Sequence, residues 1–239
     1  MNNAIILCSG GLDSTAVAYK VKSMKPKKMM LLFFNYNQKP LKEERFCVKK
    51  IASELKAEFK EIDLRWLGEI STSLINRKEK IPRAKEENLK NIRQEQENEI
   101  LYWVPCRNAV FGLIGLSHAE SLFISTKERW DVYLGIKDEG QVQLKDTTPE
   151  FLEKLNLLGE EATFHGGYKI LAPFIDKDKP EVVEIGTKLK VPWEYTYSCY
   201  SGGGFKKNKP VHCGKCHNCL LRKKAFHFSE AKDVSLYLD

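Results

Sequence analysis

Residues 4–14 read AIILCSGGLDS, and this short run predicts the architecture of the chain. Its first five residues are apolar and predict a buried strand, and residues 13–21 have the apolar spacing of a helix. Two adjacent glycines between them let the backbone approach a ligand closely. The amides of such a turn and of the helix N-terminus point toward an anion. The run therefore predicts a strand, a phosphate-binding turn and a helix.

Strand-like and helix-like segments alternate beyond this run. The apolar runs that predict further strands are residues 29–34, 59–64, 132–136 and 170–174, and the segments with helical spacing are residues 41–55, 109–119 and 179–189. This succession predicts an α/β fold with a doubly wound parallel sheet, whose ligand site lies at the carboxyl ends of the strands.

The composition is that of a globular protein, with 42% hydrophobic and 30% charged residues in a chain of 239. No apolar run approaches the roughly 20 residues of a membrane span, and the N-terminus lacks the features of a secretory signal. We therefore expect a cytoplasmic protein without a membrane span. The net charge of +7 permits an anionic partner such as ATP or RNA without specifying one.

The glycine pair belongs to the segment Ser9-Gly10-Gly11-Leu12-Asp13-Ser14. It is not a Walker loop, because no G-K-[ST] follows, and its glycine spacing excludes the dinucleotide fingerprint. It is similar to the S-G-G-x-D-S loop of the PP-loop ATP pyrophosphatases, which cleave ATP to AMP and pyrophosphate. The resemblance implies that Ser9, Ser14 and the loop amides hold phosphate oxygens and that Asp13 orients the loop or helps to hold Mg²⁺. A glycine turn followed by a simple helix cap is the alternative.

Seven cysteines are present, and four of them follow residue 198. These four are Cys199, Cys213, Cys216 and Cys219. An odd number of cysteines without a signal peptide argues against a disulfide framework and favours metal ligation. Four thiolates at this spacing can surround one tetrahedral Zn²⁺, which is then usually structural. His212 and His217 lie close enough to replace one thiolate, and a nucleic-acid-binding zinc ribbon or unpaired buried thiols would also fit.

The cysteines lie within a longer signature that resembles the 7-cyano-7-deazaguanine synthase family. Residues 196–203, TYSCYSGG, and residues 212–219, HCGKCHNC, are similar to its zinc-binding T-W-S-C-Y and C-G-x-C-x-x-C segments. Three more segments are similar in the same order: residues 34–38 with Glu43 to F-D-Y-G-Q, residues 104–108 to V-P-x-R-N, and residues 171–174 with Lys179 to P-L/F…K. The resemblance covers the length of the chain.

The resemblance implies an adenine nucleotide alpha hydrolase-like fold over residues 1–190, with a small zinc-binding region, residues 191–239, packed on the same domain. It implies that two ATP, with Mg²⁺, drive the conversion of 7-carboxy-7-deazaguanine and ammonia to the nitrile, on the route to queuosine-type or archaeosine-type tRNA bases. The implied ATP contacts are Ser9, Gly10, Gly11, Leu12, Asp13, Ser14, Tyr36 and Gln38. The implied catalytic residues are Asp13, Lys179 and Arg107, and a homodimer is expected. Non-catalytic roles are the alternatives. Lys179 would be a solvated residue at a helix start, and Arg107 would lie at a helix end or at a subunit contact.

Residues 135–151, GIKDEGQVQLKDTTPEF, depart from the family pattern G-V-N-x-E-D-x-S-G-Y-P-D-C-R-P-E-F. Glu139 and Asp146 are retained, and residues 140–145 replace the central run of the family. We expect the deazaguanine acid near Glu139 and Asp146, because carboxylates accept hydrogen bonds from the N–H groups of a guanine-like edge. The alternative is that both residues are surface acids of a Gly/Gln-rich loop.

Two functions of different kinds follow. The first is the nitrile-forming synthase. The second is a ligase that adenylates the same carboxylate and stops at an amide, with ammonia or with an amine of a protein or other macromolecule. A nucleic-acid-binding zinc module without catalysis is disfavoured because the phosphate loop would then be idle. Two AMP per product are expected for a nitrile and one for an amide.

Overall fold

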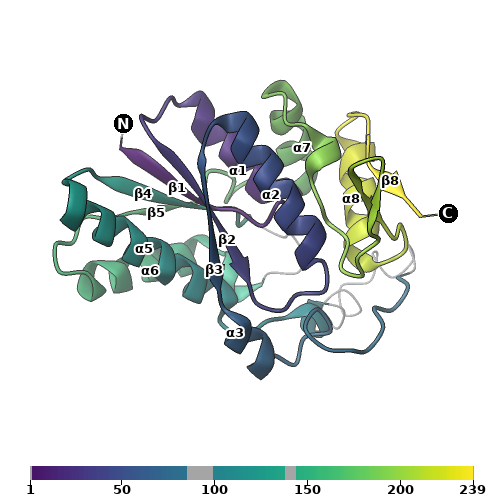
Figure 1. Cartoon of the computed structure of the whole chain (residues 1–239), viewed down its shortest axis with the longest axis horizontal. Helices are drawn as coiled ribbons and strands as arrows, with labels where there is room; N and C mark the ends of the chain where they lie inside the picture. The colour runs from purple at the N-terminus through teal and green to yellow at the C-terminus, as the bar shows by residue number, and fades with distance from the viewer. Residues whose placement is uncertain (1, 85–98, 138–143, 239) are drawn as a thin grey trace.

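The computed structural model describes residues 2–84, 99–137 and 144–238 (Figure 1). Its centre is a five-stranded sheet in the order β3-β2-β1-β4-β5, with all neighbours parallel. The strands are β1 (Asn3–Leu7), β2 (Met29–Asn35), β3 (Glu58–Asp63), β4 (Trp130–Leu134) and β5 (Ile170–Leu171). The strand order reverses between β1 and β4, and a ligand crevice opens at such a switch point. The predicted α/β fold with a doubly wound parallel sheet is confirmed.

Helices cover both faces of this sheet (Figure 1). One face carries α1 (Leu12–Ser23), α2 (Leu41–Leu55) and α7 (Lys179–Lys188), and the other carries α5 (Arg107–Thr126) and α6 (Pro149–Ala162). The short α3 (Arg65–Ile70) follows β3. Along β1, Ile6 faces the core of the first group while Ile5 and Leu7 face the core of the second. A strand buried on both faces reads as a continuous apolar run, which is why the sequence predicted β1 and β2.

The last strand and helix α6 are among the elements that differ from the sequence expectation. The last strand ends at Leu171 instead of residue 174, and Pro173, which has no backbone N–H to donate, lies in the turn that follows. Helix α6 was not predicted, although its start carries a clear signal. Thr148 caps the helix by accepting a hydrogen bond from Phe151 N, and Pro149 occupies the first turn.

The C-terminal residues form a small region beside the carboxyl ends of the strands (Figure 1). It contains the 3₁₀ turn η3 (Trp193–Tyr195), the strands β6 (Phe205–Lys206), β7 (Lys209–His212) and β8 (Leu236–Tyr237), and α8 (His217–Phe228). Phe226 of α8 meets Trp193 edge to face, with 5.6 Å between ring centroids, and both lie in the core that α1 and α7 share. The division of the chain at residue 190 stays a prediction.

A fully buried arginine, Arg222, makes hydrogen bonds to several segments of this region. The guanidinium of Arg222 on α8 donates to the Trp193 carbonyl at 3.1 Å and to Thr196 Oγ1 at 2.8 Å. It also donates to Ser198 Oγ at 3.1 Å and to Ser235 Oγ at 2.9 Å. A buried charge is tolerated only when its donors are satisfied, so Arg222 fixes the segment that leads to Cys199.

Helix α5 is long and apolar enough, by length and composition, to cross a membrane, with a mean hydropathy of 1.3 over 18 residues. The sequence predicted a helix at residues 109–119 and no membrane span there. One side of the helix packs closely, since a Cβ on Gly115 would lie 2.7 Å from Val132 of β4, and one on Gly112 would lie 2.7 Å from Leu155 of α6. In all, 22% of those 18 residues are buried.

Candidate active site

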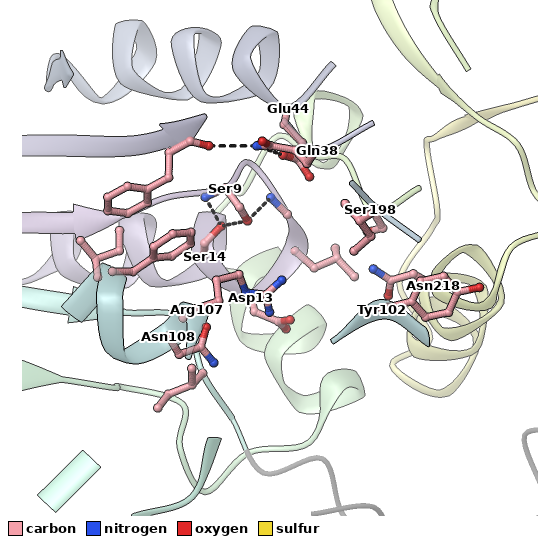
Figure 2. Close-up of a pocket in the computed structure, with 18 of the residues that line it drawn as sticks. Ser9, Asp13, Ser14, Gln38, Glu44, Tyr102, Arg107, Asn108, Ser198 and Asn218 are labelled. Atoms are coloured by element: carbon pink, nitrogen blue, oxygen red, sulfur yellow. Dashed lines mark hydrogen bonds between the residues drawn. The ribbon is translucent and has the colours of Figure 1, made fainter. Parts of the chain in front are cut away.

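A cavity of about 250 Å³ opens where β1, β2 and β4 end (Figure 2). Its walls come from the loop after β1, the turn after β2 with the start of α2, the start of α5, and the C-terminal region. The labelled residues that line it are Ser9, Asp13, Ser14, Gln38, Glu44, Tyr102, Arg107, Asn108, Ser198 and Asn218. The cavity therefore lies at the switch point of the sheet, where the fold places a ligand.

The loop after β1 is held in a tight turn by its serines. Ser9 Oγ and Ser14 Oγ lie 3.1 Å apart, and Ser14 Oγ accepts a hydrogen bond from Ser9 N at 3.2 Å. Gly10 has a φ of +75°, and a Cβ there would lie 3.0 Å from the Glu44 carbonyl oxygen, so the turn requires glycine. Tyr197 N donates to the Gly10 carbonyl at 2.7 Å, which couples the loop to the C-terminal region.

Asp13, in the first turn of α1, has a carboxylate oxygen that no hydrogen bond satisfies. Its Oδ1 is buried and has no partner within the described part of the chain. Leaving a buried acceptor unpaired costs stability, and groups of this kind concentrate at sites that receive a ligand. The position of Asp13 beside the serine turn suits a cation held against phosphates.

Arg107 and Asp146 share another wall. Arg107 is the first residue of α5, and Asp146 lies in the 3₁₀ turn η2 (Lys145–Thr147), anchored where Asn108 Nδ2 donates to its carbonyl at 3.2 Å. Burial raises the pKa of the Asp146 carboxyl above its ordinary value, and the Arg107 charge opposes that shift. Lys179, at the start of α7, also lines the cavity. Of the two acids expected at the substrate, Asp146 therefore lines the cavity, and Glu139 lies outside the described residues.

Tyr36 and Gln38, expected at ATP, also line the cavity. Burial raises the pKa of Tyr36 to about 12, so its hydroxyl stays protonated. The amide of Gln38 is engaged within the protein: Nε2 donates to the Phe34 carbonyl at 2.9 Å and to Glu44 Oε2 at 3.0 Å, and Oε1 accepts from Tyr36 N at 2.9 Å. Gln38 therefore holds the turn after β2 and positions Glu44.

The far wall is aromatic and polar. Tyr102 lies 4.4 Å from Tyr200, centroid to centroid, and Ser198 and Asn218 approach the cavity from the C-terminal region (Figure 2). The sequence interpretation assigned no role to these four residues or to Glu44. Ser198 and Tyr200 flank Cys199, and Asn218 precedes Cys219, so the zinc motif was a usable signal for three of them. No sequence motif pointed to Tyr102 or Glu44.

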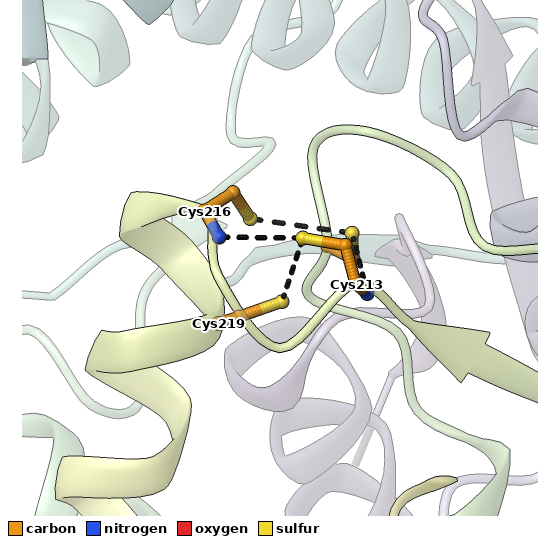
Figure 3. Close-up of side chains that lie close together, drawn as sticks. Cys213, Cys216 and Cys219 are labelled. Atoms are coloured by element: carbon orange, nitrogen blue, oxygen red, sulfur yellow. Dashed lines mark hydrogen bonds between the residues drawn. The ribbon is translucent and has the colours of Figure 1, made fainter. Parts of the chain in front are cut away.

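The four C-terminal cysteines lie close together, and Figure 3 shows three of them, Cys213, Cys216 and Cys219. Their four Sγ atoms lie within 4.8 Å of one another, with Cys213 to Cys219 at 3.9 Å and Cys199 to Cys216 at 4.0 Å. Thiolates bound at about 2.3 Å around a tetrahedral zinc ion are separated by about 3.8 Å, so the arrangement fits such an ion. The cysteines of the predicted ligand set are thus brought together.

Backbone amides surround the sulfurs and favour thiolates. Cys213 N donates to Cys199 Sγ at 3.3 Å, and Cys216 N donates to Cys213 Sγ at 3.2 Å. Hydrogen bonds from the other three thiols and from Lys215 N hold the pKa of Cys213 below its ordinary value, against burial. Both neighbouring histidines have other contacts: His212 Nε2 accepts from Ser198 N at 3.1 Å, and His217 Nε2 lies 3.3 Å from Glu99 Oε1.

Known proteins resemble this chain over nearly its whole length. Residues 3–230 match the family described as "Queuosine biosynthesis protein QueC". The 7-cyano-7-deazaguanine synthase of Methanobrevibacter smithii is 35% identical over 240 residues, covering 98% of this chain and 97% of that protein. The synthase of Methanocaldococcus jannaschii is 34% identical over 241 residues, covering 99% of each.

Two of the matching solved structures are more distant in sequence. The U34-tRNA thiolase NcsA from Methanococcus maripaludis aligns with a TM-score of 0.43 at 14% identity, over 84% of this chain and 61% of the thiolase. The NMN synthetase from Francisella tularensis aligns with a TM-score of 0.46 at 12% identity, over 97% of this chain and 78% of the synthetase.

Proposed function

Because the chain belongs to the QueC family of queuosine biosynthesis proteins, we propose that it converts 7-carboxy-7-deazaguanine and ammonia to 7-cyano-7-deazaguanine, consuming ATP. The observation that carries the proposal is the cavity itself. It unites the serine turn and Asp13 with two cations, Arg107 and Lys179, and with Asp146. Phosphate-binding groups and an acceptor for a guanine-like edge thus face one space.

Adenylation is the first task of this site. A carboxylate is a poor electrophile, so one of its oxygens attacks the α-phosphorus of ATP, pyrophosphate departs, and AMP becomes the leaving group. Ser9, Ser14 and the loop amides would hold the phosphates, and Arg107 and Lys179 would stabilise the charge that develops. Asp13 would hold Mg²⁺, which neutralises phosphate charge when bound.

The nitrogen chemistry follows in the same cavity. Ammonia adds to the acyl carbon, the bond to AMP breaks, and an amide remains. A second ATP adenylates the amide oxygen. Loss of AMP and of the two remaining N–H protons then leaves the C≡N bond.

We propose zinc as the ion of the four-cysteine cluster, with a structural role. Four thiolates leave no open position, which is typical of structural sites. Cys199 lies between Ser198 and Tyr200, and Cys219 follows Asn218, so the ion would fix the far wall of the cavity. A homodimer remains the expectation from the family resemblance, and a cytoplasmic location remains the expectation from the composition and the N-terminal sequence.

The amide-forming ligase is the second candidate. The departure at residues 140–145 favours it, because Leu144, near the end of the altered segment, lines the cavity beside the retained Asp146. A single adenylation with ammonia or with an amine of a protein or other macromolecule needs less of that segment.

The product and its stoichiometry test the proposal. With 7-carboxy-7-deazaguanine, ATP and an ammonium salt, we expect mass spectrometry to show the nitrile, with two AMP released per product. One AMP per amide product would instead establish the ligase. Absence of any 7-carboxy-7-deazaguanine-dependent AMP release would contradict both functions.

Asp146 is expected to bind the guanine-like edge. In calorimetric titrations with 7-carboxy-7-deazaguanine and a non-hydrolysable ATP analogue, Asp146→Ala should bind about tenfold more weakly than the wild type, a loss of ~1.4 kcal/mol. Glu153→Ala, which removes an exposed acid from the neighbouring α6, serves as the control and should bind normally. Equal affinities of Asp146→Ala and the wild type would remove Asp146 from the site.

A further inference from the structure

The first turn of α2 carries two adjacent acids that face different parts of the molecule. Glu43 is buried, and its Oε1 accepts a hydrogen bond from Gly204 N at 2.9 Å, which anchors the loop of the C-terminal region. Glu44 lines the cavity. The family resemblance involves Glu43, whereas in the structure its neighbour Glu44 lines the cavity.

Glu44 is held in place by Gln38. Both N–H donors of the Gln38 amide are used, one on Glu44 Oε2 and one on the Phe34 carbonyl at the end of β2 (Figure 2). Because the Gln38 oxygen accepts from Tyr36 N, the amide cannot turn without losing hydrogen bonds. Each carboxylate oxygen accepts two hydrogen bonds, so Glu44 keeps acceptor capacity beyond its bond to Gln38.

A carboxylate at this place requires an explanation, because the two proposed substrates, ATP and a carboxylic acid, are both anions. When ionised, the carboxylate would repel them in a partly dehydrated cavity unless a cation neutralises it. Arg107 contributes positive charge here, and Mg²⁺ is proposed at Asp13. Among the proposed reactants, ammonium is a further cation that the Glu44 carboxylate can bind.

The surroundings suit an acid that exchanges a proton. Burial raises the pKa of Glu44 to about 8, opposed by the hydrogen bond from Gln38 and the charge of Arg107, while Glu43 raises it further. Tyr36, Cys8 and Cys47 are the other titratable groups coupled to Glu44, and burial raises the pKa of each of these. Glu44 has the lowest pKa of these four groups, so it is the one that loses its proton as pH rises through about 8 and can then accept a proton.

We propose that Glu44 binds the ammonium ion and accepts its proton, so that ammonia is released beside the acyl-adenylate; this inference rests on the proposed function. Ammonium transfers one proton to the Glu44 carboxylate. The freed lone pair forms the bond to the acyl carbon, and the bond from that carbon to the AMP oxygen breaks with its electrons leaving on AMP. The attacking nitrogen loses a second proton to water, which leaves the amide. Gln38 is the positioning residue.

The test separates adenylation from the amine step. For Glu44→Gln we expect the KM for ammonium to rise at least tenfold, while 7-carboxy-7-deazaguanine-dependent ATP–pyrophosphate exchange changes less than threefold. Hydroxylamine, which is uncharged at neutral pH, needs no such proton acceptor and should give product with the variant at near wild-type rates. Glu43→Gln, which keeps an acceptor for Gly204 N, is the matched control and should leave the KM for ammonium unchanged.

The pH profile gives an independent readout. The acceptor must be deprotonated, so wild-type amide formation at a fixed concentration of ammonium ion should fall as pH drops through about 8, and Glu44→Gln should lack that inflection. Loss of exchange in Glu44→Gln would place the residue at ATP or its metal and overturn the proposal. An unchanged KM for ammonium, or a wild type that exchanges but never uses ammonium, would also overturn it. A wild type without exchange would instead reject the proposed function.

Discussion

Asp13→Asn and Ser14→Ala are expected to lower ATP–pyrophosphate exchange by about 100-fold or more, the scale on which enzymes lose rate when one preorganised group at a developing charge is removed. Ser14 Oγ joins the two ends of the loop through Ser9 N and Ser9 Oγ, so its loss loosens the phosphate site. The unpaired Asp13 Oδ1 has no structural partner in the described chain, so its expected role is in binding.

The stability of these variants separates function from folding. Because Asp13 Oδ1 makes no hydrogen bond within the described residues, Asp13→Asn should melt at the wild-type temperature or above it. Ser23→Ala, at the exposed end of the same helix, controls for substitution in α1 and should retain exchange. Full exchange in folded Asp13→Asn and Ser14→Ala would reject this loop as the ATP site.

Removal of the metal is expected to have the largest effect on stability. An ion present at about 1,000 times its dissociation constant stabilises the folded chain by about 4 kcal/mol. In a chain of this size each kcal/mol corresponds to roughly 2–4 °C, so chelation or Cys216→Ser should lower Tm by about 8–16 °C. Folding and binding of a structural metal are coupled, so zinc content should fall from one ion per chain together with Tm.

The control for this prediction is Cys106→Ser. Cys106 is exposed and lies outside the four-cysteine cluster, so its replacement should leave zinc content and Tm unchanged. Elemental analysis that finds a full complement of zinc in Cys216→Ser would remove Cys216 from the ligand set. A different metal in the purified wild type would contradict the assignment of zinc.

Sequence patterns predicted the structure where the interactions that form an element lie within one short segment. The apolar run before Gly10 predicted β1, and Pro180 with the helical spacing after it predicted α7, whose capping box joins Asp178 and Glu181. The cysteine spacing likewise predicted a four-thiolate set, because two residues between cysteines keep their sulfurs within reach of one ion.

Sequence patterns did not predict the direction of side chains whose partners lie far away in the chain. Glu43 and Glu44 are indistinguishable in the sequence, yet one binds Gly204 N and the other lines the cavity. Gln38 was expected to contact ATP. In the structure its amide makes hydrogen bonds to backbone groups and to Glu44. The direction of a side chain depends on the helix face that packs on the sheet, which involves residues far away in the chain.

The sequence by itself therefore determined the parallel α/β fold, the glycine turn at Gly10 and Gly11, and the grouping of the four cysteines. Each depends on interactions within a few residues or on a regular alternation of apolar side chains. Only the tertiary structure decided that Tyr102, Ser198 and Asn218 complete the cavity and that Glu44 faces it. Those residues come from three parts of the chain more than 50 residues apart, one with Glu44, one with Tyr102 and one with both Ser198 and Asn218, brought together by the reversal of strand order between β1 and β4 and by the packing of α8 against α7. No local preference encodes that proximity, because it arises from burying the faces of the sheet and its helices together.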